Sequence, residues 1–224
     1  MKMRIKHIRK ENPLIHCMTN VVVTNFTANG LLAIGASPVM AYAKEEVTEM
    51  AKVAGALLLN IGTLSHEQAE AMLIAGQAAT QAGVPVVLDP VGAGATTLRT
   101  DVSKRLLEQV NPTVLRGNAG EIASLLGKTV NVKGVDGAIS GDNGELAKQA
   151  AKQFGCLVAV TGEIDAVSDG HRVDLVYNGH PWLTKVVGAG CLLGAVIAAF
   201  LASEKTDPLR AVTEALSFTE WRQS

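Results

Sequence analysis

The sequence is poor in aromatic residues and has no excess of charge of either sign. Phe, Trp and Tyr make up 4% of its 224 residues, so the core must be built mainly from Ala, Val, Leu and Ile. The 20 Lys and Arg residues balance 21 Asp and Glu residues, which argues against the basic surface that a nucleic acid or an anionic membrane requires. We therefore expect a small-molecule partner, with no nucleic acid and no membrane.

Cysteines and long apolar runs are also scarce. Cys17, Cys156 and Cys191 are odd in number and show no C-x-x-C spacing, so neither a disulfide framework nor a zinc site is indicated. The histidines are scattered without metal-ligand spacing. The longest apolar run, residues 191–202, is too short to cross a bilayer, and no signal-peptide core follows the basic start. These absences predict a cytoplasmic protein.

Glycine is abundant, with 22 residues between short apolar runs and helical patterns. Residues 56–60 form a continuous apolar run typical of a buried parallel strand, and residues 84–89 form the next strand. Asp169-Gly170, between two apolar segments, predicts an antiparallel hairpin. We expect a single domain over residues 1–224 with an α/β fold, a three-layer αβα sandwich whose mostly parallel sheet has this hairpin at its edge.

Capping residues indicate where helices begin and end. Ser65, with Gln68 three residues later, makes a capping box for a long helix. Thr19 and Asn20 are expected to cap another helix, which Gly35 ends.

Residues 185–200 join a glycine turn directly to an apolar helix. Gly188 and Gly190 have no Cβ to block a close ligand, and the first N–H groups of the helix, at Ala189 and Gly190, can bind a phosphate. Cys191 follows at the positive end of the helix, where the pKa of a thiol is expected to be lowered. Taken alone, the segment is explained more simply by packing, because Cys is often buried.

Polar residues end three of the expected strands: Asp89, Arg116 and Thr161. Ligands bind at the carboxyl ends of strands in open α/β sheets, so we expect these side chains to converge there. Asn118 and Glu121 form a capping box that by itself marks an ordinary helix start. A helix N-terminus, an arginine and two carboxylates, Asp89 and Glu121, that can hold Mg²⁺ through water are the parts of phosphoryl transfer. Together they predict ATP-dependent transfer to a small hydroxyl.

Two familiar nucleotide signatures are excluded. Gly127-Lys128-Thr129 looks like the end of a P-loop, but Ile122 stands where that motif needs glycine. The third glycine of a dinucleotide fingerprint would fall at Thr97.

Eight stretches of the chain carry a family resemblance: residues 12–14, 25–33, 35–40, 60–64, 87–96, 116–118, 160–163 and 178–180. In order and along nearly the whole length, they resemble the hydroxyethylthiazole kinase family of the ribokinase-like superfamily. Most ribokinase-like enzymes carry an aspartate base after the same glycine turn, whereas the thiazole kinases are similar to this chain in having a cysteine, here Cys191.

The resemblance implies a ribokinase-like fold and phosphorylation of the hydroxyl of 4-methyl-5-(2-hydroxyethyl)thiazole by ATP with Mg²⁺, in thiamine salvage. It also implies a homotrimer with its sites at subunit boundaries. By matching position, the implied residues are Met40, Gly188 and Asn25 for the thiazole, Arg116 and Thr161 for ATP, Asp89 and Glu121 for magnesium, and Cys191, Gly190 and Ala189 for the reacting groups.

The sequence departs from the family pattern at three places. Val187 stands where the family commonly has threonine, and Gly120 replaces an alanine. The resemblance stops after Phe218, so the carboxyl-terminal end is expected to be shortened relative to the family. Two alternatives follow: a ribokinase-like kinase for another small alcohol such as hydroxymethylpyrimidine, or a thiazole-binding protein with weak turnover.

Overall fold

The computed structural model describes residues 2–128, 142–177, 179, 185–204 and 206–219, except for the side chains of Lys2 and Met3. Two of the residues that carry the family resemblance, Asn178 and His180, lie outside this part of the chain, as do residues 220–224.

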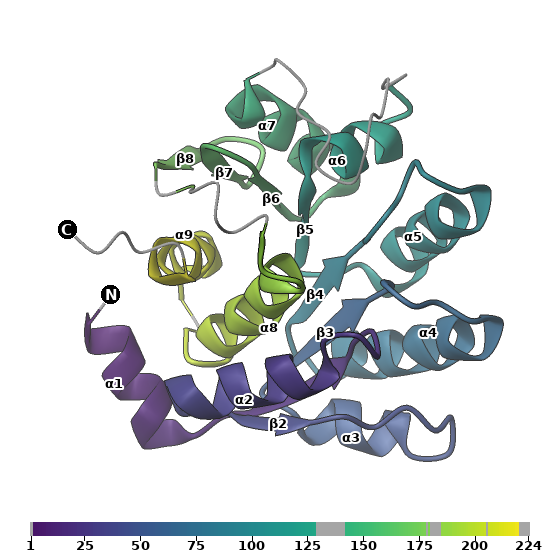
Figure 1. Ribbon diagram of the computed structural model, residues 1–224, viewed down its shortest axis with the longest axis vertical. Helices are drawn as coiled ribbons and strands as arrows, with labels where there is room; N and C mark the ends of the chain where they lie inside the picture. The colour runs from purple at the N-terminus through teal and green to yellow at the C-terminus, as the bar shows by residue number, and fades with distance from the viewer. Residues whose placement is uncertain (1, 129–141, 178, 180–184, 205, 220–224) are drawn as a thin grey trace.

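The described strands form one eight-stranded sheet in the order β2-β1-β3-β4-β5-β6-β7-β8 (Figure 1). The first six are parallel to their neighbours, whereas β7 pairs antiparallel with β6 and with β8. The mostly parallel sheet with an antiparallel edge hairpin is thereby confirmed. The strands are β1 Leu14–Met18, β2 Ser37–Val39, β3 Ala56–Asn60, β4 Val86–Asp89, β5 Val114–Asn118, β6 Leu157–Thr161, β7 Asp165–Ser168 and β8 Val173–Val176.

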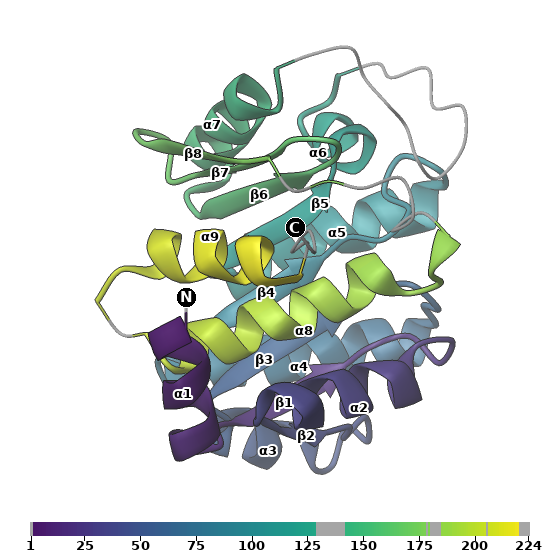
Figure 2. The same cartoon turned by 60° about the vertical axis from the view of Figure 1, so that its left-hand side comes forward.

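Helices cover both faces of the sheet, which gives the expected three layers. On one face lie α3 Val47–Val53, α4 His66–Gln81, α5 Thr97–Val110, α6 Ala119–Leu125 and α7 Asn143–Phe154. On the other face lie α1 Lys2–Glu11, α2 Thr24–Ile34, α8 Ala189–Ala202 and α9 Pro208–Thr219. Figure 2 shows α8 running across this face between α2 and α9.

The central strands are apolar throughout because both of their faces are buried. Along β3, Leu57 and Leu59 pack against the α4 side, while Leu58 packs against the α8 side, as the two-residue period of a strand requires. Helix α8 reads as continuously apolar for the same reason, since residues 193–201 are all buried between the sheet and its neighbouring helices.

Most predicted helix ends are confirmed. Ser65 and Gln68 form the expected capping box at the start of α4. Gly35 ends α2 with a φ of 100°, a left-handed conformation that favours glycine. The predicted capping box of Asn118 and Glu121 opens α6.

The predicted cap of α2 is wrong. The helix begins at Thr24, and the preceding residue, Val23, makes no side-chain cap hydrogen bond. The side chain of Asn20 turns instead toward Asn60 and Cys191, so an amide that reads as a helix cap belongs to the edge of the sheet. Helix α1 was also not expected, because its sequence is short and mostly polar and basic.

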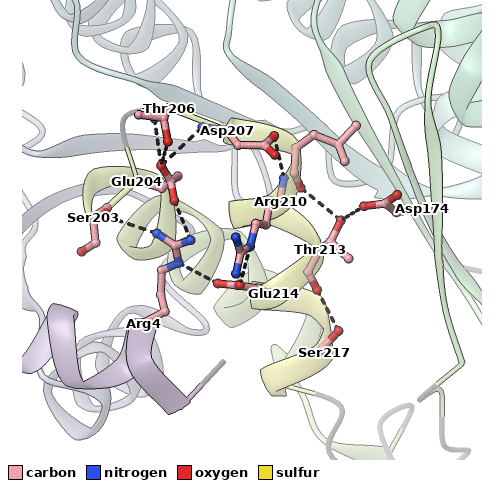
Figure 3. A network of polar contacts seen from close by, with 11 residues as sticks. Arg4, Asp174, Ser203, Glu204, Thr206, Asp207, Arg210, Thr213, Glu214 and Ser217 are labelled. Carbon is pink, nitrogen blue, oxygen red and sulfur yellow. Dashed lines mark hydrogen bonds and ion pairs between the residues drawn. The ribbon is translucent and has the colours of Figure 1, made fainter.

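Arg4 links α1 to two glutamates that lie about 200 positions later in the chain. Its guanidinium forms ion pairs of 2.6 Å with Glu204, in the turn after α8, and with Glu214 of α9 (Figure 3). Glu214 also pairs with Arg210 at 2.9 Å. The two contacts of Arg4 hold α1 against α9 and the turn after α8, while the pair with Arg210 lies within α9.

Candidate active site

Five polar side chains lie at the carboxyl edge of the sheet, where the parallel strands end. They are Asn20 after β1, Asn60 in β3, Asp89 in β4, Arg116 in β5 and Thr161 in β6. Asn60 and Asp89 are register partners on neighbouring strands. The expected meeting of Asp89, Arg116 and Thr161 is observed, but Arg116 does not end its strand as predicted, because β5 continues to Asn118. The two asparagines extend this group toward α8.

A chain of amide hydrogen bonds joins Cys191 to Asp89. Asn20 Nδ2 donates to Sγ of Cys191 at 3.3 Å and to Oδ1 of Asn60 at 2.9 Å. Asn60 Nδ2 donates in turn to Oδ2 of Asp89 at 2.8 Å. Because Oδ2 of Asp89 accepts from Nδ2 of Asn60, Oδ1 of Asn60 is left to accept from Asn20, which orients both amides. The sulfur of Cys191 is thus an acceptor toward Asn20, which leaves its own S–H free to point elsewhere.

Arg116 continues this chain toward the opposite side of the edge. Its Nη1 lies 3.5 Å from Oδ2 of Asp89, and its Nη2 donates to Oγ1 of Thr161 at 2.8 Å. The guanidinium also lies directly under the start of α8: a Cβ added at Gly190 would stand 3.0 Å from both Nη atoms. Glycine at position 190 therefore allows the first turn of α8 to approach a buried positive charge.

The two carboxylates, Asp89 and Glu121, are both buried, but they differ in their partners. Burial raises the pKa of Asp89 to about 7, against the opposing effect of Arg116. Its Oδ1 has no hydrogen-bond partner in the part of the chain that the structure describes. Glu121 accepts from the N–H of Gly92 at 2.8 Å and of Asn118 at 2.9 Å, and burial raises its pKa as well. Asp89 thus has an oxygen to offer, whereas Glu121 is already held by the backbone.

Helix α8 begins next to these groups. Gly188 precedes the helix with a φ of 84° and makes no side-chain cap. A Cβ there would collide with Val23, so the turn packs against the start of α2. The N–H of Ala189 donates to the carbonyl of Val186 at 3.2 Å, whereas those of Gly190 and Cys191 lie in a first turn that offers no intrahelical acceptor.

The expectation of a lowered pKa for Cys191 is wrong. Burial raises the pKa of this thiol, and the carboxylate of Asp89 raises it further. Hydrogen bonds from Asn60 and Asn20 and the charge of Arg116 act in the opposite direction but are outweighed. A helix N-terminus lowers a thiol pKa only where the thiol is not also desolvated. At neutral pH, Cys191 is therefore a protonated thiol.

The other two residues named for the thiazole lie in different surroundings. Met40 follows β2 and is partly buried at the same sheet edge, packed against the cluster that includes α8. Asn25 lies exposed in the first turn of α2, where its Oδ1 accepts from Asn29 at 3.0 Å. The structure thus brings Asn20, rather than Asn25, to Cys191.

Sequence reasoning missed three residues of this edge: Asn20, Asn60 and Arg99. Asn60 ends an apolar strand as Asp89 does, and that position was the available signal. Arg99 in α5 donates to the carbonyls of Ile61 at 3.1 Å, Val91 at 2.6 Å and Gly62 at 2.8 Å. It thereby joins the loops that follow β3 and β4, a long-range contact that has no pattern in the sequence.

A shallow hollow of about 720 Å³ lies at the opposite edge, between the turn of the β7–β8 hairpin and the end of α7. It is lined by Arg172 and Asp169, which pair with each other at 2.9 Å. It lies at the amino ends of β5 and β6, away from the edge where open α/β sheets bind ligands.

Among the helices that the structure describes, we find none with the length and apolarity to cross a lipid bilayer. Within the same residues, no three or more His, Cys, Asp and Glu side chains are grouped to hold a metal ion. Cys17, Cys156 and Cys191 are free thiols.

Comparison with known proteins gives consistent matches. The model of the Hydroxyethylthiazole kinase family matches residues 5–221. The hydroxyethylthiazole kinase of Halalkalibacterium halodurans is 67% identical over 205 residues, which is 92% of this chain and 78% of that protein.

Solved structures agree with this sequence match. The structure of a hydroxyethylthiazole kinase from Pyrococcus horikoshii is similar with a TM-score of 0.87 and 47% identity, over 96% of this chain and 82% of that one. A ribokinase-like superfamily protein from Enterococcus faecalis is 14% identical with a TM-score of 0.64, over 92% of this chain and 76% of that one, a likeness of fold alone. The expected ribokinase-like architecture is confirmed.

Proposed function

Because the chain belongs to the hydroxyethylthiazole kinase family, we propose that it transfers the γ-phosphoryl group of ATP to the hydroxyl of 4-methyl-5-(2-hydroxyethyl)thiazole, a step of thiamine salvage. One observation carries the proposal. The open first turn of α8, with Cys191 facing Asn20, lies directly against Arg116, so an anion site and a polar group for an alcohol adjoin each other. The same family membership favours the thiazole alcohol over hydroxymethylpyrimidine.

On the alcohol side, Cys191 would contact the reacting hydroxyl. Its raised pKa means that it is not a preformed thiolate base. A loose phosphoryl-transfer transition state asks little of a base, because the alcohol proton is lost late. The thiol would therefore act mainly by orienting the hydroxyl, while the hydrogen bond from Asn20 holds the sulfur in position.

On the nucleotide side, Arg116 and Thr161 would bind the phosphates of ATP. Their 2.8 Å hydrogen bond holds the guanidinium in place before the ligand arrives. The amides of Gly190 and Cys191 would donate hydrogen bonds to the oxygens of the phosphoryl group during its transfer to the alcohol, whereas the amide of Ala189 would first have to give up its bond to Val186.

The buried carboxylates fit a magnesium ion held largely by phosphate and water. Oδ1 of Asp89, which lacks a partner among the described residues, is the oxygen with capacity to spare. Glu121, whose two oxygens accept backbone N–H groups, would act through water. Mg²⁺ is usually bound by one or two carboxylates together with several waters and the phosphates of a nucleotide, which agrees with this pair of side chains. When bound, the ion would neutralise charge between the β- and γ-phosphates.

The thiazole side would be formed by Met40 and Gly188, and we propose that it lies at a subunit boundary of a homotrimer. Apolar side chains are exposed around it: Val21, Val22 and Phe26 at the start of α2, and Val186 and Val187 before α8. Val187 has 75% of its surface exposed, and exposed apolar side chains grouped in this way are typical of a protein–protein interface. The exposed Asn25 would then face the site of a neighbouring subunit.

A cytoplasmic location is part of the proposal. It rests on the three free thiols, which a reducing compartment preserves.

The direct test follows ADP release with Mg-ATP and either the thiazole alcohol or hydroxymethylpyrimidine, with the phosphorylated product identified by mass spectrometry. We expect turnover of the thiazole alcohol and a kcat/KM at least about 100-fold lower for the pyrimidine. Stabilisation by the thiazole alcohol without ADP release would instead indicate a binding protein.

A further inference from the structure

His16 occupies a place in the sheet where an apolar side chain would be expected. It lies in the middle of β1, between Val39 of β2 and Leu57 of β3, and is completely buried. Its chain neighbours Ile15 and Cys17 are buried and belong to the apolar core. Packing alone gives no reason for an imidazole at this position.

The imidazole makes one well-formed hydrogen bond and leaves its other nitrogen unused. Its Nε2 lies 2.8 Å from the carbonyl oxygen of Ala41. Because a carbonyl can only accept, Nε2 carries the hydrogen. Nδ1 has no partner among the residues that the structure describes. A buried nitrogen without a hydrogen-bond partner destabilises the folded protein. We therefore attribute the presence of histidine here to its bond with Ala41.

Ala41 belongs to the segment that follows β2 and precedes α3, outside both elements, and the carbonyl of Ala43 further along this segment accepts from the N–H of Glu46 at 3.0 Å and of Val47 at 3.1 Å. A second side chain fixes the same segment. The hydroxyl of Tyr42 donates to the carbonyl of Thr19 at 3.0 Å and accepts from its N–H at 3.4 Å. Two consecutive residues are thus bound to β1 and its end, directly beside Asn20.

We propose that His16 is a positioning residue for the alcohol substrate: by holding the carbonyl of Ala41, it fixes the adjacent Met40 at the thiazole side of the site. The inference rests on the proposed function, in which Met40 contacts the thiazole. His16 touches neither substrate and acts only through the backbone of residues 40–42.

The test compares two substitutions of His16. His16→Leu removes the donor and keeps an apolar side chain of similar size, whereas His16→Gln keeps an N–H near the position of Nε2. A matched control is Leu57→Met, a buried, volume-conserving change at the register partner of His16. KM and kcat are measured for both substrates, together with the melting temperature.

We expect His16→Leu to raise the KM for the thiazole alcohol by about three- to tenfold, the worth of one hydrogen bond, with the KM for ATP and kcat within about twofold of the wild type. His16→Gln should recover most of the loss, and Leu57→Met should change neither KM. The melting temperature of His16→Leu should not fall in parallel, because the change also removes the unpaired, buried Nδ1, which offsets the lost bond to Ala41.

An unchanged KM for the alcohol in a folded His16→Leu protein would overturn the inference, as would an equal rise in both KM values. Should His16→Leu not fold, Tyr42→Phe decides, since it removes the second bond to the same segment. A selective rise in the KM for the alcohol supports the positioning role, and no change refutes it. Absence of turnover in the wild type would refute the proposed function instead.

Discussion

At the scale of single residues, Asp89 joins the two sides of the candidate site and is completely buried. Its carboxylate accepts from Asn60 and lies beside Arg116, yet desolvation raises its pKa to about 7. It therefore stands between two protonation states at neutral pH, a common property of functional carboxylates.

This raised pKa predicts a pH-dependent stability. In the unfolded chain Asp89 ionises near its ordinary pKa of 3.8, whereas the folded protein keeps the proton up to about pH 7. The contribution of Asp89 to the unfolding free energy is therefore lost as pH rises through this window, by at most about 4 kcal/mol. Urea unfolding at several pH values should show the wild type losing stability relative to Asp89→Asn. A difference that stays constant with pH would contradict the burial of an ionisable group there.

Cys191 and Arg116 give a contrasting pair of variants. Cys191→Asp should keep kcat within about tenfold of the wild type, because positioning and phosphate binding carry most of the rate. Arg116→Ala should raise the KM for ATP at least about tenfold, because a phosphate-binding cation is lost. Steady-state kinetics with both substrates measures each effect. An Asp variant that folds and binds the thiazole alcohol but does not turn over would assign Cys191 a chemical role that aspartate cannot fill.

At this scale, the sequence predicts which residues lie at the carboxyl edge of the sheet. It does not predict how burial and neighbouring charges change their pKa values. Asp89, Arg116 and Thr161 could be placed because strand ends in a parallel sheet share an edge. The pKa of Cys191 could not be predicted, because it depends on burial and on Asp89, which lies 102 positions away in the chain. Asn20 was read as a helix cap because asparagine serves both purposes with the same amide.

At the scale of elements, the loops after β3 and β4 are shaped by one side chain of α5. The guanidinium of Arg99 binds three carbonyl oxygens, from Ile61, Gly62 and Val91. The second loop continues to Gly92, whose N–H holds Glu121. Helix α5 thus holds the loop whose Gly92 N–H binds Glu121 and which directly follows Asp89.

Arg99→Lys should therefore destabilise the protein by about 2–4 kcal/mol, because an ammonium cannot reproduce three bonds in a planar fan. Denaturant unfolding measures the loss, and the activity should fall with it as the loops separate. Arg105→Lys on the same helix is the control: its pair with Glu70 is exposed, so a change within about 0.5 kcal/mol is expected. Equal effects of the two changes would show that the carbonyl contacts of Arg99 contribute little.

Elements with strong periodicity or clear caps were predictable, and those held by distant contacts were not. The apolar run of β3 and the capping box of α4 each identify themselves locally. Helix α1 does not, because what holds it is the pairing of Arg4 with Glu204 and Glu214. The start of α2 was misplaced for a related reason, since the residues before it serve the site.

At the scale of the whole molecule, the exposed apolar residues around the start of α2 and the turn before α8 predict the assembly. Phe26→Glu should convert the proposed trimer to monomers and lower the activity, because it places a charge where apolar side chains would meet. Light scattering coupled to size-exclusion chromatography gives the mass. Val53→Glu, at an exposed apolar position on the other face of the sheet, should leave the mass unchanged. A wild type that is monomeric would contradict the proposed trimer.

The ion pairs of Arg4 also bear on the order in which the protein folds. The bond to Glu214 spans 210 positions of the chain, so during synthesis α1 is made long before its partner residue exists. Contacts of such sequence separation form late and slowly. Docking of the first helix is therefore expected among the closing events of folding, after the central strands have paired.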